Sequence, residues 1–394
     1  MQANPETEAV RPSAEEEAAL LDAIERWVER EVRPIAREHD LEDRYPAELV
    51  EQMKELGLFG ATISPRYGGL GLSAWTYAQI VMKVASVWMA PVGIFNSHLI
   101  MAAAIERFGT EDQKERYLPR MARGELRGGI ALTEPDAGSD LQAIRTVARR
   151  EGDHYVVNGR KTWITNAYHG HMTLLLVKTD PNAEPRHRGM SLLIAEKGPG
   201  FVVAKKLKKL GYRAIDSCEL AFEDYRVPAA DLLGGVEGQG FYQIAAGLEL
   251  GRINVAARGA GIAEGALRLA LAYALERRAF GKPIAEHQAI QLKLADMATQ
   301  VEAAKRLIES AARKYDLGQR CDLEASMAKY FATEAGVSCA SEAMRIFGGY
   351  SYSVEYEIER YYRDAMLMCI GEGTNEIQRL IIARQLVKRQ RGES

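Results

Sequence analysis

The spacing of apolar residues changes twice along the chain, from a helical period to a strand period and back again. In residues 1–128 the period is helical. Capping boxes that begin at Ser13 and Thr110 each precede an amphipathic segment, which predicts the first turn of a helix. Residues 73–108 predict two long apolar helices with a break near Pro91. We therefore expect a helical N-terminal domain.

Residues 129–238 have the period of strands. The dipeptide Asn158-Gly159 lies between two strand-like runs and predicts a hairpin, because it supplies both positive-φ positions of a type I′ turn. Four more short runs follow, separated by Gly, Pro and Asp: MTLLLVK, MSLLIAE, FVVAKK and CELAFEDY. We expect an antiparallel β domain inserted between two helical ones.

The helical period returns in residues 239–394. Five long segments are predicted to be helices: 239–278, 287–318, 322–347, 354–369 and 374–390. Helices of this length and apolarity usually form a bundle, with faces left for partner subunits. The predicted fold class is α+β multidomain, with an N-terminal helical domain (1–128), a middle antiparallel β domain (129–238) and a C-terminal helical bundle (239–394).

Composition narrows the class of protein. The chain of 394 residues is 47% hydrophobic and 27% charged with a net charge of −3, so no basic field favours nucleic acid. No apolar run reaches the roughly 18 residues of a membrane span. Four dispersed cysteines without a C-x-x-C pair predict free thiols in a reducing compartment. The N-terminus has no signal-like pattern, so we expect a cytoplasmic protein, or a mature form that has lost its targeting segment.

Several short motifs match known functional patterns, but the sequence around them does not support those functions. The glycines of 259–265 have the spacing G-x-G-x-x-x-G inside a helical pattern, which favours close helix packing over dinucleotide binding. The S-x-x-K at 326–329 has none of the companion motifs of a β-lactamase. The H-x-H at 169–171 has no third ligand cluster, so no metal site is expected.

Two motifs in the predicted β domain suit a bound ligand. The turn LTEPDAGSD (132–140) offers hydroxyls at Thr133 and Ser139, and its glycine allows close approach to the backbone. KTWITN (161–166), at the end of the hairpin, presents the large flat side chain of Trp163. A structural turn and a core aromatic are the alternative interpretations.

Two further motifs lie in the predicted bundle. ERRAFGKPIAEHQAIQ (276–291) gathers basic groups near a helix junction, which suits a diphosphate as well as a solvated charge run. RDAMLMCIGEGTNEIQRLIIAR (363–384) carries Glu372 between two glycines, after an apolar helix and before the N-cap Thr374. Burial would raise the pKa of this carboxyl toward the range of a general base, although a carboxylate here could simply complement the helix dipole.

These four motifs, in this order along a helical–β–helical chain, resemble the acyl-CoA dehydrogenase family over nearly the whole length. The resemblance implies that Glu372 is the catalytic base. Residues implied in FAD binding are Ile130, Leu132, Thr133, Ser139, Trp163, Thr165, Arg277, Phe280, Gln288, Arg345, Gly348, Gly349, Thr374 and Glu376. Residues implied near the thioester are Ser139, Glu249, Arg252 and Gly373.

The implied reaction is α,β-dehydrogenation of an acyl-CoA thioester to a trans-2-enoyl-CoA. Glu372 would remove the α-proton, and the β-hydrogen would pass as hydride to N5 of FAD. An electron-transfer flavoprotein would be the electron acceptor. The resemblance also implies a homotetramer, in which Arg277, Phe280 and Gln288 reach the FAD of a neighbouring subunit. No nucleic-acid or membrane partner is expected.

Some positions depart from the family pattern. Arg345 stands where a glutamine is common, Ser351 where a glycine is common, and Glu357 where a proline is common. Gly251 occupies the position at which other members place their base, so Glu372 has no competitor there.

The acyl group and its carrier stay open at this stage. Bulky Trp88 and Phe95, expected at the pocket base with Met89 and Asn96, favour a short or branched acyl chain. The alternatives are a thioester of an acyl carrier protein, a flavoprotein of this fold without dehydrogenase activity, and a non-enzymatic helical scaffold.

Overall fold

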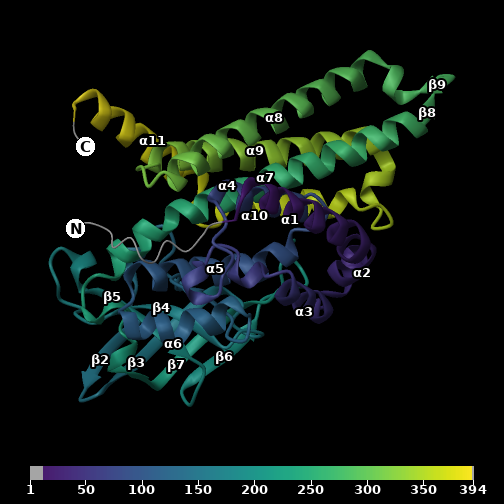
Figure 1. The fold of residues 1–394 in the computed structure, drawn as a ribbon. Helices are drawn as coiled ribbons and strands as arrows, with labels where there is room; N and C mark the ends of the chain where they lie inside the picture. Colours follow the sequence, from purple (N-terminus) through teal and green to yellow (C-terminus); the bar gives the residue numbers. More distant parts are fainter. Residues whose placement is uncertain (1–11, 393–394) are drawn as a thin grey trace.

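The computed structural model describes residues 12–392, and helices form the first part of the chain (Figure 1). These helices are α1 (Ala14–Trp27), α2 (Arg33–Glu42), α3 (Ala47–Glu55), α4 (Ala74–Ala85), α5 (Ala90–Phe108) and α6 (Glu111–Ala122). Both predicted capping boxes are present. The predicted break at Pro91 is wrong by a few residues. Helix α4 ends at Ala85, and Pro91 lies in the first turn of α5, where a missing N–H costs nothing.

Seven strands form one sheet in the middle of the chain. They are β1 (Gly128–Ala131), β2 (Val147–Glu151), β3 (His154–Thr165), β4 (Met172–Lys178), β5 (Met190–Glu196), β6 (Phe201–Lys206) and β7 (Ser217–Pro228). Most neighbouring strands pair antiparallel, as expected, but β4 pairs parallel with β1 and, at one residue, with β2. Alternate residues of β4 face two different hydrophobic cores, so both faces of the sheet are covered.

The hairpin turn predicted at Asn158-Gly159 is wrong. Strand β3 continues through both residues, and the chain reverses at the turn of residues 152–153, between β2 and β3. The pairing of β3 with β7 shifts register just before Gly159. A Cβ at Gly159 would lie 2.4 Å from Oγ1 of Thr146, so the glycine permits a bulge and a close backbone approach instead of a turn.

The last part of the chain is the predicted helical bundle. It contains α7 (Gly240–Glu276), α8 (Gln288–Asp316), α9 (Asp322–Phe347), α10 (Ile358–Ile370) and α11 (Asn375–Gln390), with two short strands, β8 (Arg278–Ala279) and β9 (Lys282–Pro283), at one end. The predicted role of the α7 glycines is confirmed. A Cβ at Gly259 would lie 2.7 Å from the carbonyl oxygen of Ala332 on α9.

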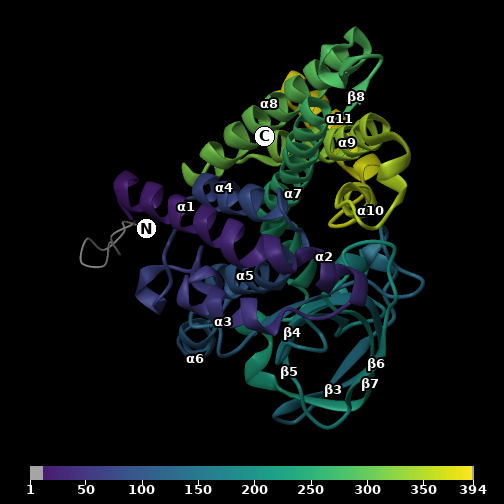
Figure 2. The same ribbon diagram turned by 90° about the vertical axis from the view of Figure 1, so that its right-hand side faces the viewer.

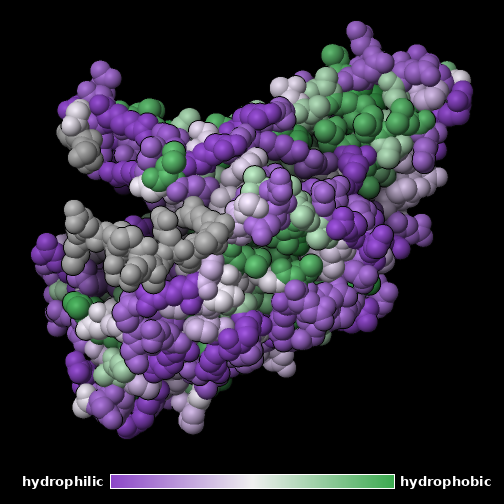
Figure 3. Space-filling model, in the orientation of Figure 1, coloured by the Kyte–Doolittle hydropathy of each residue, from purple (hydrophilic) through white to green (hydrophobic). Residues whose placement is uncertain are grey.

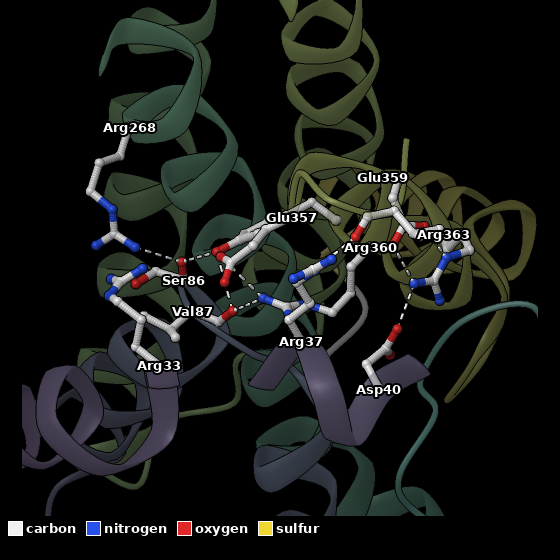
Figure 4. Close-up of polar contacts among 12 residues, drawn as sticks. Arg33, Arg37, Asp40, Ser86, Val87, Arg268, Glu357, Glu359, Arg360 and Arg363 are labelled. Atoms are coloured by element: carbon white, nitrogen blue, oxygen red, sulfur yellow. Dashed lines mark hydrogen bonds and ion pairs between the residues drawn. The ribbon is translucent and has the colours of Figure 1, made fainter. Parts of the chain in front are cut away.

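The N-terminal helices lie between the sheet and the long C-terminal helices (Figures 1 and 2). One large hydrophobic core joins the N-terminal helices to the bundle and to one face of the sheet. An arginine–carboxylate cluster ties α2, α10 and the turn after α4 together (Figure 4). Within it, Arg363 pairs with Asp40 and Glu359, and the buried Arg360 donates to the carbonyl oxygen of Val87 at 2.9 Å.

Three further features bear on function. All four cysteines are free, and three of them are buried. Within residues 12–392, no group of three or more His, Cys, Asp and Glu side chains is arranged to hold a metal ion. Over the same residues, none of the helices combines the length and the apolarity needed to cross a bilayer.

Candidate active site

The turn between α10 and α11 presents the predicted catalytic base. Helix α10 ends at Ile370, and the hydroxyl of Thr374 accepts the N–H of Ile377 as the N-cap of α11. Between them, Glu372 (φ 54°) and Gly373 (φ 88°) both have left-handed backbone conformations. Such a conformation is strained for a glutamate and persists only where the surrounding structure enforces it. The turn directs the Glu372 carboxylate back toward α7, as its contacts show.

Two side chains hold one oxygen of this carboxylate. Oε1 of Glu372 accepts a hydrogen bond from Nη2 of Arg258 at 2.7 Å and from Nδ2 of Asn96 at 3.4 Å. The Arg258 side chain is 5% exposed and that of Glu372 is 26% exposed. Oε2 of Glu372 has no partner among residues 12–392. One oxygen is therefore anchored and the other is available to a substrate.

Burial raises the pKa of Glu372, which is the direction expected from the sequence. The ion pair with Arg258 opposes this effect, and Lys329 opposes it further, but burial has the larger influence. Lys329 itself donates to Oδ1 of Asn375 at 2.8 Å, and burial lowers its pKa to about 8. A carboxyl group with a raised pKa suits general-base chemistry near neutral pH.

Helix α7 passes directly against this carboxylate. A Cβ built on Gly251 would lie 2.9 Å from Oε2 of Glu372 and 3.6 Å from Cδ1 of Ile100. Any side chain at position 251 would therefore enter the space beside the base. The absence of a side chain at Gly251 leaves that space to a ligand.

A chain of buried polar groups continues from Glu372 into the protein. The Tyr77 hydroxyl donates to Oδ1 of Asn96 at 3.1 Å and accepts from Nδ2 of Asn254 at 2.9 Å. Sequence reasoning missed Tyr77, Asn254 and Arg258. A signal for two of them was present, because Gly251, Asn254 and Arg258 lie three and four residues apart and so share one face of α7.

The two motifs of the β domain come together, as their order along the chain predicted. The N–H of Thr162 donates to the carbonyl oxygen of Thr133 at 2.9 Å, and β1 packs against the end of β3 so closely that a Cβ at Gly129 would meet the carbonyl oxygen of Thr165 at 2.5 Å. This pairing brings Ile130, Leu132 and Thr133 beside Trp163 and Thr165.

The side chain of Trp163 belongs to neither of the two hydrophobic cores that flank the sheet. Its side chain is 59% exposed, and its φ of 62° coincides with a register shift between Lys161 and Ile164 in the pairing of β3 with β7. The bulge turns a large aromatic ring away from the packed interior. Such a ring is suited to stacking on a planar ligand.

A buried ion pair supports the turn at 132–140 from beneath. Nζ of Lys161 lies 2.8 Å from Oε1 of Glu134 and 2.9 Å from the carbonyl oxygen of Leu132. Burial lowers the pKa of Lys161 to about 8, although Glu134 opposes the shift. The Glu134 carboxylate also accepts hydrogen bonds from the backbone N–H groups of Arg145 and Thr146. It therefore joins the beginning of the loop between β1 and β2 to its end.

Helix α5 connects these strand ends with the carboxylate. Nδ2 of Asn166 donates to the carbonyl oxygen of Ile94 at 2.8 Å and to that of Gly128 at 3.2 Å. Asn96, two residues after Ile94, reaches Glu372. The segment just after β3 and the Glu372 carboxylate therefore both contact the first turns of α5.

A second group of predicted residues lies at the far end of α7. Arg277, Gly348 and Gly349 line one pocket of about 520 Å³ together with aromatic and aliphatic side chains of Tyr273, Phe347, Tyr350, Ile284 and Ile346. The Arg277 guanidinium lies 5.7 Å from the centre of the Tyr350 ring. Phe280 is 97% exposed, and Gln288 is exposed at the start of α8.

The remaining predicted residues differ in their exposure and contacts. Ser139 is exposed on its loop, Glu376 is exposed on α11, and Arg345 pairs with Glu342 on α9. Glu249 and Arg252 interact with Asp322 at the start of α9. Burial, followed by the contact with Asp322, raises the pKa of Glu249 to about 7.

Three family models match successive parts of the chain. They describe the N-terminal domain (residues 14–125), the middle domain (129–225) and the C-terminal domain (238–387) of acyl-CoA dehydrogenases. The chain is 41% identical to an acyl-CoA dehydrogenase of Bacillus subtilis (strain 168), over 95% of this chain and 98% of the relative. It is 40% identical to the bovine mitochondrial short-chain specific acyl-CoA dehydrogenase, over 92% of this chain and 88% of the relative.

The fold agrees with solved structures of the same kind. Butyryl-CoA dehydrogenase of Megasphaera elsdenii superimposes with a TM-score of 0.91 at 36% identity, over 98% of this chain and all of that one. Matches of this extent to all three domains, at this level of identity, show that the protein is an oxidoreductase that belongs to the acyl-CoA dehydrogenase family.

Proposed function

We propose that the protein dehydrogenates a short acyl-CoA thioester between its α- and β-carbons, with Glu372 as the base that removes the α-proton. The observation that carries the proposal is the Glu372 carboxylate itself. It is anchored through Oε1, its Oε2 has no partner among residues 12–392, and burial raises its pKa. The position beside it on α7 is a glycine, so no second carboxylate competes for the substrate there.

The protein's own part in the reaction is proton removal and substrate positioning. An α-C–H next to a thioester is a very weak acid, so the developing negative charge on the thioester oxygen must be stabilised by preorganised donors. We assign one donor role to the backbone N–H of Glu372, which belongs to the strained turn between Gly371 and Gly373. The anchored Oε1 keeps Oε2 of Glu372 toward the α-carbon.

The described residues fit FAD as the cofactor. The exposed ring of Trp163, beside Thr165, Thr133 and Leu132, suits the flat isoalloxazine ring. The pocket with Arg277, Gly348 and Gly349 suits the diphosphate and adenosine end of the FAD of a neighbouring subunit. When bound, FAD would supply the hydride acceptor for the β-hydrogen. The flavin-facing motifs contain no His or Cys, so we propose non-covalent binding.

The electron acceptor we propose is an electron-transfer flavoprotein. A structure described as the electron transferring flavoprotein of Acidaminococcus fermentans includes a chain that superimposes on this one with a TM-score of 0.92 at 38% identity. We also propose a homotetramer. Figure 3 shows apolar side chains gathered over the end of α7 and α8, where Leu271, Leu275 and Leu292 are each at least 45% exposed. A partner subunit that covers this surface would receive Phe280 and Gln288.

A thioester of an acyl carrier protein is the second candidate substrate. Prolyl acyl carrier protein oxidase AnaB superimposes on this chain with a TM-score of 0.90 at 31% identity. The acyl site would be the same in both cases, and only the carrier would differ.

Anaerobic bleaching of the flavin absorbance tests these proposals. The purified holoenzyme is mixed with a panel of acyl-CoA and acyl-carrier-protein thioesters, and Glu372→Gln is measured beside it. We expect rapid bleaching by at least one short acyl-CoA, and a loss of several orders of magnitude in Glu372→Gln with thioester binding retained, because glutamine keeps the shape of the side chain and removes the base. A colourless protein, or a variant with more than about a tenth of wild-type turnover, contradicts the proposal.

A further inference from the structure

We infer that the acyl group of the substrate carries a carboxylate at its far end and that Arg258 binds it. This inference rests on the proposed function and names the substrate class: monothioesters of short dicarboxylic acids. Arg258 lies on α7, seven residues after Gly251 and therefore on the face of the helix that meets Glu372. It was not among the residues predicted from sequence, and its contact with Glu372 leaves part of its guanidinium unpaired.

The first observation is how Arg258 is buried. Its side chain is 5% exposed, and its one ion pair within residues 12–392 is with Glu372. A buried guanidinium is stable only while it has a counter-ion and hydrogen-bond acceptors. Nε of Arg258 has no acceptor among the described residues, so the guanidinium keeps an unused hydrogen-bond donor.

The second observation concerns charge balance during the reaction. When Glu372 takes up the α-proton it becomes neutral, and Arg258 then loses its counter-ion while still buried. Lys329 is the other cation near Glu372, and its hydrogen bond to Asn375 holds it there. Its positive charge adds to that of Arg258. A purely aliphatic acyl chain brings nothing to compensate the two cations. A carboxylate on the chain compensates Arg258 both before and after proton transfer.

The third observation is the polarity of the surrounding wall. Asn96, Tyr77 and Asn254 form a buried hydrogen-bonded row beside Glu372 and Arg258, where an acyl pocket for simple fatty chains would need apolar groups. The row offers a polar end to the pocket.

The distances limit the length of the acyl group. Nη2 of Arg258 lies 2.7 Å from Oε1 of Glu372, and Oε2 of Glu372 is the oxygen assigned to the α-hydrogen. An anion that binds Arg258 must therefore sit within a few bonds of the α-carbon. Short dicarboxylic acyl groups such as succinyl and glutaryl place a terminal carboxylate within that range.

The test compares acyl groups that differ only at the far end. Glutaryl-CoA is paired with pentanoyl-CoA and succinyl-CoA with butyryl-CoA, and kcat/KM is measured with the holoenzyme. We expect a preference of at least about tenfold for the better dicarboxylic member over its aliphatic partner, since an uncompensated buried charge is costly. Arg258→Gln should lose that preference, and Arg258→Lys should keep part of it. Arg268→Gln, on the same helix but bound to the carbonyl oxygen of Ser86, is the matched control.

Binding provides a readout that does not depend on turnover. In Glu372→Gln the neutral side chain resembles the protonated base, so Arg258 has no counter-ion of its own. Calorimetry should show glutaryl-CoA binding at least about tenfold more tightly than pentanoyl-CoA to this variant, and the double variant with Arg258→Gln should not discriminate. If Arg258 only positions Glu372, Arg258→Gln will slow both acyl classes equally, and the inference is overturned.

The two proposals fail in different ways. If pentanoyl-CoA or butyryl-CoA is the better substrate of the wild type, the inference about Arg258 is wrong and the proposed dehydrogenation stands. If no thioester of either class bleaches the flavin, the proposed function itself is wrong.

Discussion

At the scale of single residues, the pKa and the orientation of the Glu372 carboxylate depend on the residues around it. Burial raises its pKa, whereas Arg258 and Lys329 lower it. The flanking glycines in the sequence indicated a special turn, and the structure shows that Glu372 itself adopts the left-handed conformation. The carboxylate is thereby held against α7, which explains why Gly251 is the other position from which a base could act.

Relocation of the base is the first prediction. Glu372→Gly combined with Gly251→Glu should recover part of the activity that Glu372→Gly alone loses, because both positions border the same space. Recovery should be incomplete, since a misplacement of about 1 Å can cost about a hundredfold in rate. Stopped-flow bleaching of the flavin measures it. A double variant as inactive as Glu372→Gly would show that position 251 does not face the α-carbon.

The pH dependence of the reaction is the second prediction. The base must be ionised, so kcat/KM should fall as pH decreases through the pKa of Glu372. Arg258 holds that pKa down against the effect of burial, so its removal should raise it. In Arg258→Gln the acid limb of the pH profile should therefore lie at higher pH than in the wild type, and in Arg268→Gln it should not move. An acid limb that stays in place in Arg258→Gln would mean that the limb reports another group.

At the scale of elements, helix α7 carries the site because it can approach its neighbours closely. Its glycines remove side chains where backbones meet. A Cβ at Gly265 would lie 2.2 Å from the carbonyl oxygen of Ser86, and one at Gly261 would lie 2.6 Å from that of Met82. These contacts fix the position of α7 along the axis of α4. They therefore also fix where Arg258 and Gly251 lie relative to Glu372.

Two alanine substitutions in α7 test this packing. Gly265→Ala should destabilise the fold by about 1–3 kcal/mol, because the added methyl group meets backbone that cannot move aside easily. Gly247→Ala is the matched control, since its Cβ would meet nothing within 4 Å, and it should leave stability unchanged or raise it by up to about 1 kcal/mol. Thermal unfolding of both variants gives the comparison. An equal melting temperature for the two would contradict the close-packing role.

In the β domain, strand pairing between distant residues outweighed the local turn preference of the sequence. Asn158-Gly159 has the composition of a tight turn, yet β3 runs straight through it because β7 pairs along both sides of the bulge. Strand pairing buries apolar residues toward both ends of β3, at Tyr155, Val157 and Ile164, and one turn preference cannot outweigh that. The Asn158 side chain instead donates to the carboxylate of Asp224 on β7 at 3.0 Å.

At the scale of the whole molecule, an apolar surface at the end of α7 and α8 needs a partner. Leu275 and Leu292 are each 61% exposed and Phe280 is 97% exposed. Contiguous exposed apolar residues of this kind mark interaction sites. The pocket that contains Arg277 lies at the same end of the bundle, so assembly and completion of the cofactor site are expected to depend on each other.

Disruption of this surface is the last prediction. Leu275→Glu should shift the protein toward smaller species in analytical ultracentrifugation at micromolar concentration and weaken FAD retention, because a charge would have to be buried in the interface. Val202→Glu, on β6 of the sheet and 41% exposed, is the control and should sediment as the wild type does. A flavin-loaded monomer in the wild type would refute the proposed assembly.

The sequence by itself determined the order of helices and strands, both capping boxes, the five long C-terminal helices and the turn that carries Glu372. These features depend on periodicity and on local hydrogen bonds, which a few neighbouring residues specify. Only the tertiary structure decided that Arg258 pairs with that carboxylate, that Tyr77 and Asn254 continue the hydrogen-bonded row beside it, and that Glu249 and Arg252 lie near Asp322. Those contacts join residues far apart in the chain, and the packing of α7 against α4, α5 and the α10–α11 turn sets them, which no local pattern encodes.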